Sequence, residues 1–124
     1  MIKYTLRKYS GKLQQVFHAA YKTMEVSPMI KDENMDYLFE AILTLKSVDE
    51  CYAFFEDLCT PQELKAISQR LHVAKLLTGD CVYNEIVKQT GASTATISRV
   101  NKTLNYQAAG GYKIVFDRLK EDKE

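Results

Sequence analysis

The fold is decided by one stretch, Tyr83–Asn105, which reads YNEIVKQTGASTATISRVNKTLN. Ile86 and Val87 are the apolar residues of a short first helix. Gly91 stands where the chain must turn, in a backbone conformation that suits glycine. Ser93 follows as the N-cap of a second helix, because its hydroxyl can accept a backbone N–H of the first turn. The pattern predicts a helix-turn-helix.

The second helix of this motif has two different faces. Ile97, Val100 and Leu104 recur at i, i+3 and i+7, so we expect this face to pack inward. The opposite face carries short hydroxyls and cations, and no carboxylate occurs from residue 91 to residue 105. A helix that reads DNA needs small side chains to enter the major groove and cations for phosphates or guanine edges. The residues of this polar face are Thr94, Thr96, Ser98, Arg99 and Lys102. A capped, solvated helix of another all-α protein would show the same pattern, and that alternative stays open at this point.

The length of 124 residues suits one domain, or one domain with an arm. No apolar run approaches the roughly 18–20 residues that a membrane span needs. Met1–Ser10 alternates charged and aromatic residues and lacks the apolar region of a signal peptide. We therefore expect a cytoplasmic protein without a membrane partner.

The formal net charge of +1 hides an uneven distribution. Residues 1–31 carry a net charge of +5, residues 32–59 carry −7, and residues 83–106 carry +2. A nearly neutral protein can therefore still present a basic surface at the predicted helix-turn-helix. The acidic middle segment argues against non-specific coating of DNA.

The three cysteines and two histidines do not form a recognisable site. Cys51, Cys59 and Cys81 make an odd number without a CxxC motif, so we expect buried, reduced thiols. His18 and His72 are too few and too scattered for a metal site. Cys81 and His72 are formally available as a catalytic pair, but nothing in the sequence orients them. We expect no catalytic residues, no metal ligands and no enzyme activity.

Helix signals occur along the whole chain. Thr60-Pro61-Gln62-Glu63 is a capping box with proline in the first turn, and Gly79 ends the helix that it starts. Ser47 and Glu50 form a second capping box. This second box starts the aromatic-rich helix that carries Cys51–Leu58, and the other expected helices are Lys12–Glu25, Met35–Lys46 and Tyr112–Lys120. The sequence predicts an all-α fold of six or seven helices.

Two features of this helical chain bear on its organisation. Pro28 and the polar run Lys31–Asn34 predict a boundary between a basic arm, residues 1–31, and a helical domain, residues 32–124. The arm is either an extension that contacts phosphates or a partner, or a helix laid on the domain. The aromatic-rich helix Cys51–Leu58 belongs either to a large core or to a dimer seam.

Three motifs resemble the Trp repressor superfamily, and within it the TrpR-like YerC/YecD family of transcriptional regulators. They are TPQELKAISQRL at Thr60–Leu71, TGASTATISRV at Thr90–Val100 and LKSVDECYAFFEDLC at Leu45–Cys59. The resemblance implies a homodimer with intertwined N-terminal helices, in which each protomer presents a helix-turn-helix. Two-fold symmetry would place two reading helices about 34 Å apart and require a palindromic operator in double-stranded DNA.

The resemblance also assigns roles to residues. It implies that Ser93, Thr94, Ala95, Thr96 and Ser98 face bases or nearby phosphates, while Arg99 and Lys102 contact phosphates or flanking positions. In the tryptophan-sensing members, two arginines hold the indole, and Arg70 and Arg99 match them. The further residues of this candidate effector pocket are Thr60, Val100 and Thr103.

Several pocket positions depart from the tryptophan-sensing pattern. Val100 stands where the family uses a small residue, and its branched side chain would intrude on a flat indole ring. Thr103 replaces the serine that helps to hold the amino group, and the connection Gly79–Tyr83 is one residue shorter. A small-molecule corepressor stays open, but the sequence does not favour L-tryptophan. For Arg70 a structural ion pair with the acidic segment is the alternative to a ligand contact.

Together these observations predict a sequence-specific DNA-binding transcriptional regulator of the repressor type, acting as a homodimer through residues 83–105. The alternative is a helical protein-interaction module that kept the shape of the helix-turn-helix. Arg99 and Lys102 discriminate between them, since DNA binding needs these cations and the alternative does not.

Overall fold

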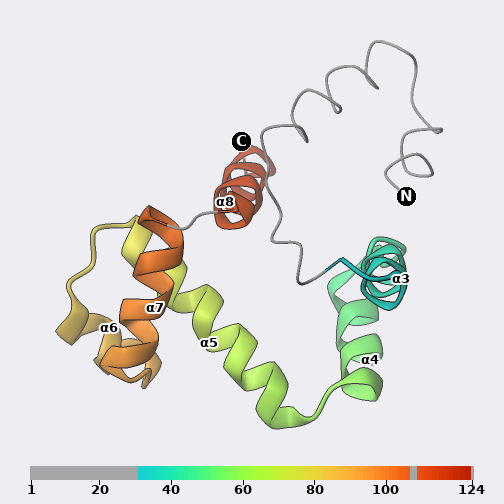
Figure 1. Ribbon diagram of the computed structural model, residues 1–124, viewed down its shortest axis with the longest axis horizontal. Helices are drawn as coiled ribbons and strands as arrows, with labels where there is room; N and C mark the ends of the chain where they lie inside the picture. Colours follow the sequence, from blue (N-terminus) through green and yellow to red (C-terminus); the bar gives the residue numbers. More distant parts are fainter. Residues whose placement is uncertain (1–30, 107–108, 124) are drawn as a thin grey trace. The chain divides into compact units, whose positions relative to one another are not determined.

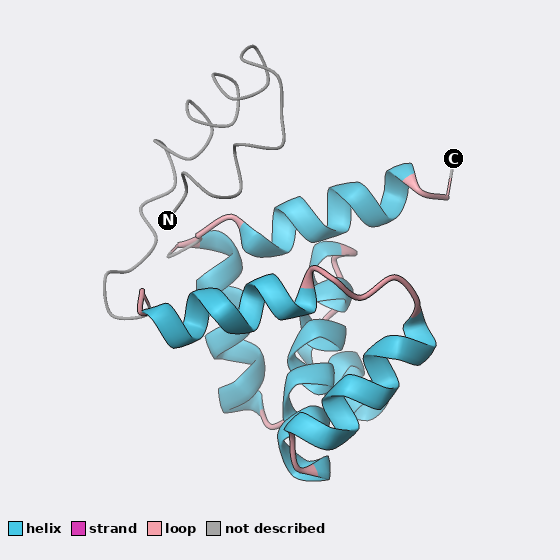
Figure 2. Ribbon diagram, turned by 90° about the vertical axis from the view of Figure 1, so that its right-hand side faces the viewer, coloured by secondary structure: helices cyan, strands magenta, loops and turns pink. Residues whose placement is uncertain are grey.

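The computed structural model describes residues 31–106 and 109–123 of the chain, and this described part is all-α (Figures 1 and 2). The described helices belong to one compact unit, residues 32–124. The segments Met1–Ser10 and Lys12–Glu25, for which the sequence predicts an arm and a helix, lie outside the described residues. The helices are α3 (Glu33–Ile42), α4 (Val48–Leu58), α5 (Pro61–Thr78), α6 (Tyr83–Thr90), α7 (Thr94–Asn105) and α8 (Gly111–Glu121).

The starts of α3, α4 and α5 are encoded by local caps. The side chains of Asp32, Ser47 and Thr60 accept the backbone N–H three residues further on, at 2.7, 3.1 and 3.2 Å. At Thr60 the predicted capping box is complete, because the Glu63 carboxylate also accepts the Thr60 N–H at 2.9 Å. Each cap satisfies an N–H that the first helical turn leaves without a partner.

Two predicted helix details differ from the structure. The helix expected over Met35–Lys46 begins at Glu33 and ends at Ile42, because Asp32 caps it and the chain then tightens into i→i+3 turns. There Thr44 Oγ1 donates to the Ala41 carbonyl at 2.6 Å, which competes with a continued helix. The capping box at Ser47 forms only in part, since the Glu50 carboxylate accepts the N–H of Lys46 and not that of Ser47.

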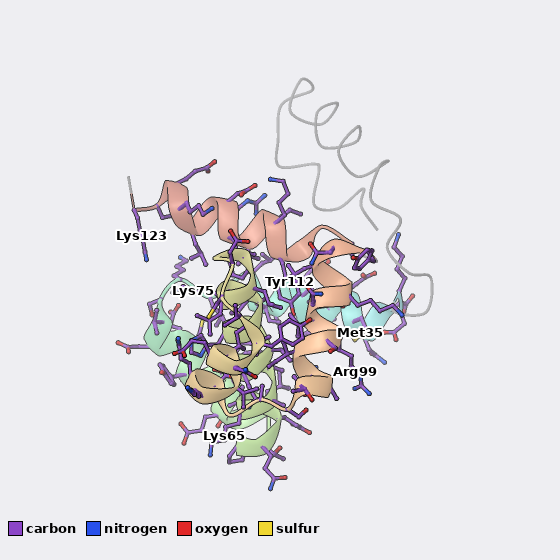
Figure 3. All side chains as sticks on the ribbon, turned by 90° about the vertical axis from the view of Figure 1, so that its left-hand side faces the viewer. Met35, Lys65, Lys75, Arg99, Tyr112 and Lys123 are labelled. Carbon is purple, nitrogen blue, oxygen red and sulfur yellow. The ribbon has the colours of Figure 1, made fainter. Side chains whose placement is uncertain are left out.

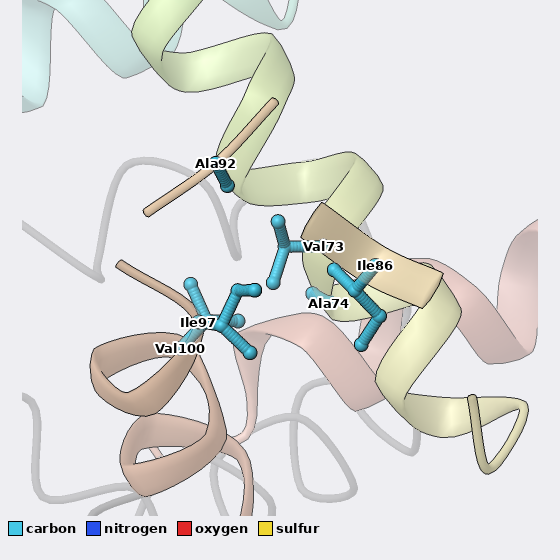
Figure 4. Packing of buried hydrophobic residues seen from close by; sticks show 6 residues of the cluster. All are labelled: Val73, Ala74, Ile86, Ala92, Ile97 and Val100. Atoms are coloured by element: carbon cyan, nitrogen blue, oxygen red, sulfur yellow. The ribbon is translucent and has the colours of Figure 1, made fainter. Parts of the chain in front are cut away.

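The core of the described part lies where α5, α6 and α7 meet (Figure 4). α5 packs against α6 and α7, and these two also pack against each other. The buried side chains are short, with two alanines and no aromatic ring among them, so the helices can approach closely. The core residues are Val73 and Ala74 of α5, Ile86 of α6, Ala92 of the turn, and Ile97 and Val100 of α7.

Outside this core, none of the described helices buries a residue completely, but the helices differ in whether they pack on the core. α8 packs on the core through Tyr112 and Phe116, whose rings stack with centroids 6.0 Å apart. α3 and α4 contain no buried residue, and Figure 1 shows them at the N-terminal end of α5, away from α6 and α7. Phe54 and Phe55 of α4 meet edge to face but stay half-buried. The aromatic-rich helix is therefore not part of a large core within the described chain.

The expectation of buried thiols is wrong in degree. All three cysteines are free, but Cys51, Cys59 and Cys81 are half-buried and not fully enclosed. Cys51 and Cys59 lie on or beside α4, which buries nothing completely. Cys81 packs at the edge of the core in the connection between α5 and α6.

Gly91 holds the turn between α6 and α7 in the left-handed region, at φ 69°. Its N–H closes α6 by donating to the Val87 carbonyl at 2.8 Å. A Cβ added to Gly91 would meet no atom within 4 Å. Any cost of a side chain at this position must therefore come from the backbone conformation and not from a clash.

We predict that Gly91→Ala lowers the free energy of unfolding by about 1 kcal/mol, the penalty of an L-residue in the left-handed region. Urea unfolding followed by circular dichroism measures the change. Gly111→Ala is the matched control, because Gly111 is equally open but lies in α8 without a positive φ. It should leave stability unchanged or raise it by up to about 1 kcal/mol. Equal losses in both variants would contradict this account of the turn.

Candidate nucleic-acid interface

The turn between α6 and α7 is held by hydrogen bonds on both sides of Gly91. Thr90 Oγ1 donates to the Ile86 carbonyl at 2.7 Å and accepts the Ala92 N–H at 3.1 Å. The Thr90 carbonyl accepts from Gln69 Nε2 of α5, also at 3.1 Å. The Thr90 hydroxyl thus links the end of α6 to Ala92, which is part of the core, and the Thr90 carbonyl is hydrogen-bonded to α5.

The start of α7 confirms the predicted cap. Ser93 Oγ accepts the Thr96 N–H at 3.2 Å, and the two hydroxyls lie 3.1 Å apart. The first turn of α7 contains no acidic residue. The partial positive charge of the helix N-terminus is therefore not neutralised by a carboxylate on its own first turn.

One continuous face of α7 is exposed, opposite the buried Ile97 and Val100. Figure 3 shows Arg99 projecting outward from this helix. Thr96 is half-buried at the edge of the face, and its hydroxyl is engaged with Ser93. The structure brings the other predicted reading residues together on the exposed surface: Ser93, Thr94, Ala95, Ser98, Arg99 and Lys102.

The residues of the candidate effector pocket are mostly engaged elsewhere. Val100 is 4% exposed and belongs to the core. Both the N–H and the hydroxyl of Thr60 are used by the capping box, and Thr103 Oγ1 donates to the Arg99 carbonyl at 3.1 Å. Arg99 and Arg70 are exposed. The ion pair considered for Arg70 is not found among the described residues, whose one salt bridge lies in α8.

A groove that the sequence did not reveal runs between the C-terminal half of α5, the end of α7 and α8. Its volume is about 650 Å³, and Leu71, Leu77, Leu104 and Phe116 are among its apolar lining residues. It could not be found from sequence periodicity, because its walls come from three separate helices.

Charged residues of α8 also line this groove. Lys113 Nζ and Asp117 Oδ2 lie 2.6 Å apart. This hydrogen bond raises the pKa of Lys113 and lowers the pKa of Asp117. The pair is exposed, so it contributes little to stability. Lys120 completes the charged lining.

Neither a metal-ligand cluster nor a membrane-spanning helix is found in residues 31–106 and 109–123. No group of three or more His, Cys, Asp or Glu side chains there could hold a metal ion. None of the helices in these ranges is both long enough and apolar enough to cross a membrane.

Comparison with known proteins gives one consistent family. The sequence model described as Trp repressor protein matches residues 33–120. The protein YerC of Bacillus subtilis (strain 168) is 48% identical over 92 residues, which are 74% of this chain and 88% of YerC.

Solved structures agree with this match. A TrpR-like protein from Eubacterium eligens ATCC 27750 is 52% identical, with a TM-score of 0.71 over 74% of this chain and 94% of that protein. A candidate Trp repressor from Staphylococcus aureus is 43% identical, with a TM-score of 0.72 over 79% of this chain and 96% of that protein. The family match covers all six described helices almost completely. The chain therefore belongs to the Trp repressor family, within its TrpR-like YerC branch.

Proposed function

We propose that the protein is a sequence-specific DNA-binding regulator of the repressor type that acts as a homodimer through α6, the turn at Gly91 and α7. The family places the chain among DNA-binding regulators and not among enzymes. The observation that carries the finer proposal is the outer face of α7, which is exposed, rich in hydroxyls and cations, and free of carboxylates.

The composition of this face supports direct reading of DNA. Thr94, Ala95 and Ser98 are small enough for the helix to enter the major groove, where short side chains can contact base edges and thymine methyl groups. Arg99 and Lys102 supply cations for phosphates or guanine edges. The buried opposite face fixes α7 on α5, so the exposed face is presented by a packed support.

The homodimer is supported by the apolar surface that one chain leaves uncovered. α3 and α4 have 10 and 11 residues, and helices this short are marginal in water without a packed apolar face. Neither buries a residue completely. Ile67 and Leu71 on α5 are also exposed, at 53% and 42%. A second copy would cover these surfaces.

Charge indicates which surfaces would meet. The segment that contains α3 and α4 is acidic, with a net charge of −7 over residues 32–59. The apolar groove beside α8 is lined by Lys113, Asp117 and Lys120, and the Lys113–Asp117 pair leaves Lys120 as its excess positive charge. We propose that the acidic helix pair of one protomer covers the groove and the exposed face of α5 of its partner.

Three residues of the candidate effector pocket are already engaged within the protein itself. Val100 is enclosed by the protein's own core, and Thr60 and Thr103 are occupied by bonds within their own helices or caps. These engagements support DNA binding that needs no L-tryptophan.

We predict that selection from random duplex DNA will enrich a palindrome, and that the affinity for DNA will be higher at low salt than at physiological salt, because contacts to phosphates release counterions. Arg99→Ala should weaken binding to all sequences. Ser98→Ala should change sequence preference, with effects of about 1–3 kcal/mol per base contact. Thr96→Ala should change preference and remove the contact between the Thr96 and Ser93 hydroxyls, while the cap bond from the backbone N–H of residue 96 to Ser93 remains.

The double variant Arg99→Ala/Lys102→Ala is the control for this selection. It removes both cations of the exposed face, and neither side chain is buried. Unchanged DNA affinity in the double variant would contradict the assigned reading face. It would then favour the protein-interaction module as the function of the helix-turn-helix.

For the dimer, we predict that Ile67→Asp converts the protein from dimer to monomer in sedimentation equilibrium at micromolar concentration. A charge at this half-exposed position is tolerated in a monomer but must be desolvated in a seam. Val82→Asp is the matched control, since Val82 is 68% exposed in the connection before α6, outside the proposed seam. If the wild-type protein is a monomer in the same sedimentation experiment, the proposed dimer is wrong.

For the effector, we predict that L-tryptophan changes DNA affinity by less than twofold. The chain contains no tryptophan, so excitation at a wavelength that its eight tyrosines do not absorb lets the fluorescence of added L-tryptophan report its binding. Anisotropy of labelled DNA measures affinity in the same samples. A tenfold gain in affinity, about 1.4 kcal/mol, would mean that the core around Val100 opens to admit the ring.

A further inference from the structure

One side-chain hydrogen bond stands apart from the others in the described residues. Gln69 Nε2 donates to the Thr90 carbonyl at 3.1 Å, across 21 positions of sequence. The other side-chain hydrogen bonds there join residues no more than four positions apart. Gln69 therefore provides the direct polar link, within this part of the chain, between α5 and the helix-turn-helix.

The bond lies at the end of α6, directly before the turn that leads into α7. Thr90 is the last residue of α6, and its carbonyl is one of those that a helix end leaves without an intrahelical partner. Both Gln69 and Thr90 are half-buried and line a polar groove of about 430 Å³ between α5 and the end of α6. Gly91 and Ser93, which follow directly, set the direction in which α7 leaves the turn.

The core holds α6 and α7 against α5 by close packing. Its six side chains are short and apolar, and apolar burial is non-directional. A hydrogen bond is directional, with a preferred distance and angle. Gln69 therefore adds a directional constraint to the core, because its bond fixes the point along α5 at which the end of α6 lies.

We propose that Gln69 is a positioning residue for DNA reading, which fixes the orientation of α6 and α7 on α5 and so sets the spacing between the two reading helices of the dimer. The proposal rests on the proposed function for its DNA consequence. α5 carries both Gln69 and the exposed Ile67 and Leu71 of the proposed seam, so the orientation of each reading helix would follow from the dimer through this bond.

The first test measures the link without DNA. Gln69→Met keeps the length of the side chain and removes the donor, and Gln69→Glu does so while keeping polarity. Loss of one hydrogen bond of ordinary net strength should speed amide exchange at Gly91 and Ala92 about fivefold. Gln89→Met is the matched control, because Gln89 lines the same groove but bonds within α6, to Glu85 at 3.2 Å. Unchanged exchange in both Gln69 variants would overturn the proposal.

The second test measures spacing. The palindrome selected by the wild-type protein is rebuilt with one base pair added or removed between its half-sites. Wild type and Gln89→Met should discriminate strongly against both altered sites, whereas the Gln69 variants should lose about fivefold of that discrimination. A purely structural weakening would lower affinity for all three sites alike, and that result would overturn the positioning role.

The two tests separate failure of this inference from failure of the proposed function. If the wild-type protein selects no DNA, the proposed function fails while the exchange experiment still decides whether Gln69 holds the turn. If the wild-type protein selects a palindrome but the Gln69 variants keep its spacing preference, the function stands and the positioning role is rejected.

Discussion

The packing of α7 on α5 is the interaction on which the rest of this structure depends. Val73 and Ala74 present a short, smooth surface, and Ile97 and Val100 lie against it with Ile86 and Ala92 completing the cluster. Two of the six core side chains are alanines that are almost completely buried, so the helices lie close together. The contact determines which face of α7 is buried and which is exposed.

Local signals explain which parts of the fold the sequence could predict. Thr60 with Glu63, Ser93 with Thr96, and Gly91 each act over three or four residues, and all three appear in the structure as the sequence indicates. The inward spacing of Ile97 and Val100 is equally local, and both are buried. Fold class and the helix-turn-helix follow from such short-range information.

What the sequence could not show depends on contacts between distant residues. Nothing in the periodicity of α5 distinguishes Gln69 from the other polar residues of that helix, since its partner lies on α6. The groove beside α8 is likewise built from three helices. The aromatic residues of α4 fit a core or a seam in sequence, with a core as the default, and their incomplete burial in one chain supports the proposed seam. The structure shows that the residues of the α7 reading face are exposed, whereas their contact with DNA stays a prediction.

The uneven charge of the chain, with −7 over residues 32–59 and +2 over residues 83–106, has a consequence for how the molecule meets a polyanion. Within residues 32–124 the acidic α3 and α4 lie away from α6 and α7, so this unit has an electric dipole, and the field of a nucleic acid exerts a torque on it before contact. The acidic end is turned away and the basic end is turned inward, so fewer collisions occur in an unproductive orientation. Because this torque acts over the Debye length, about 8–10 Å at ordinary ionic strength, it shapes the encounter rate more than the final affinity.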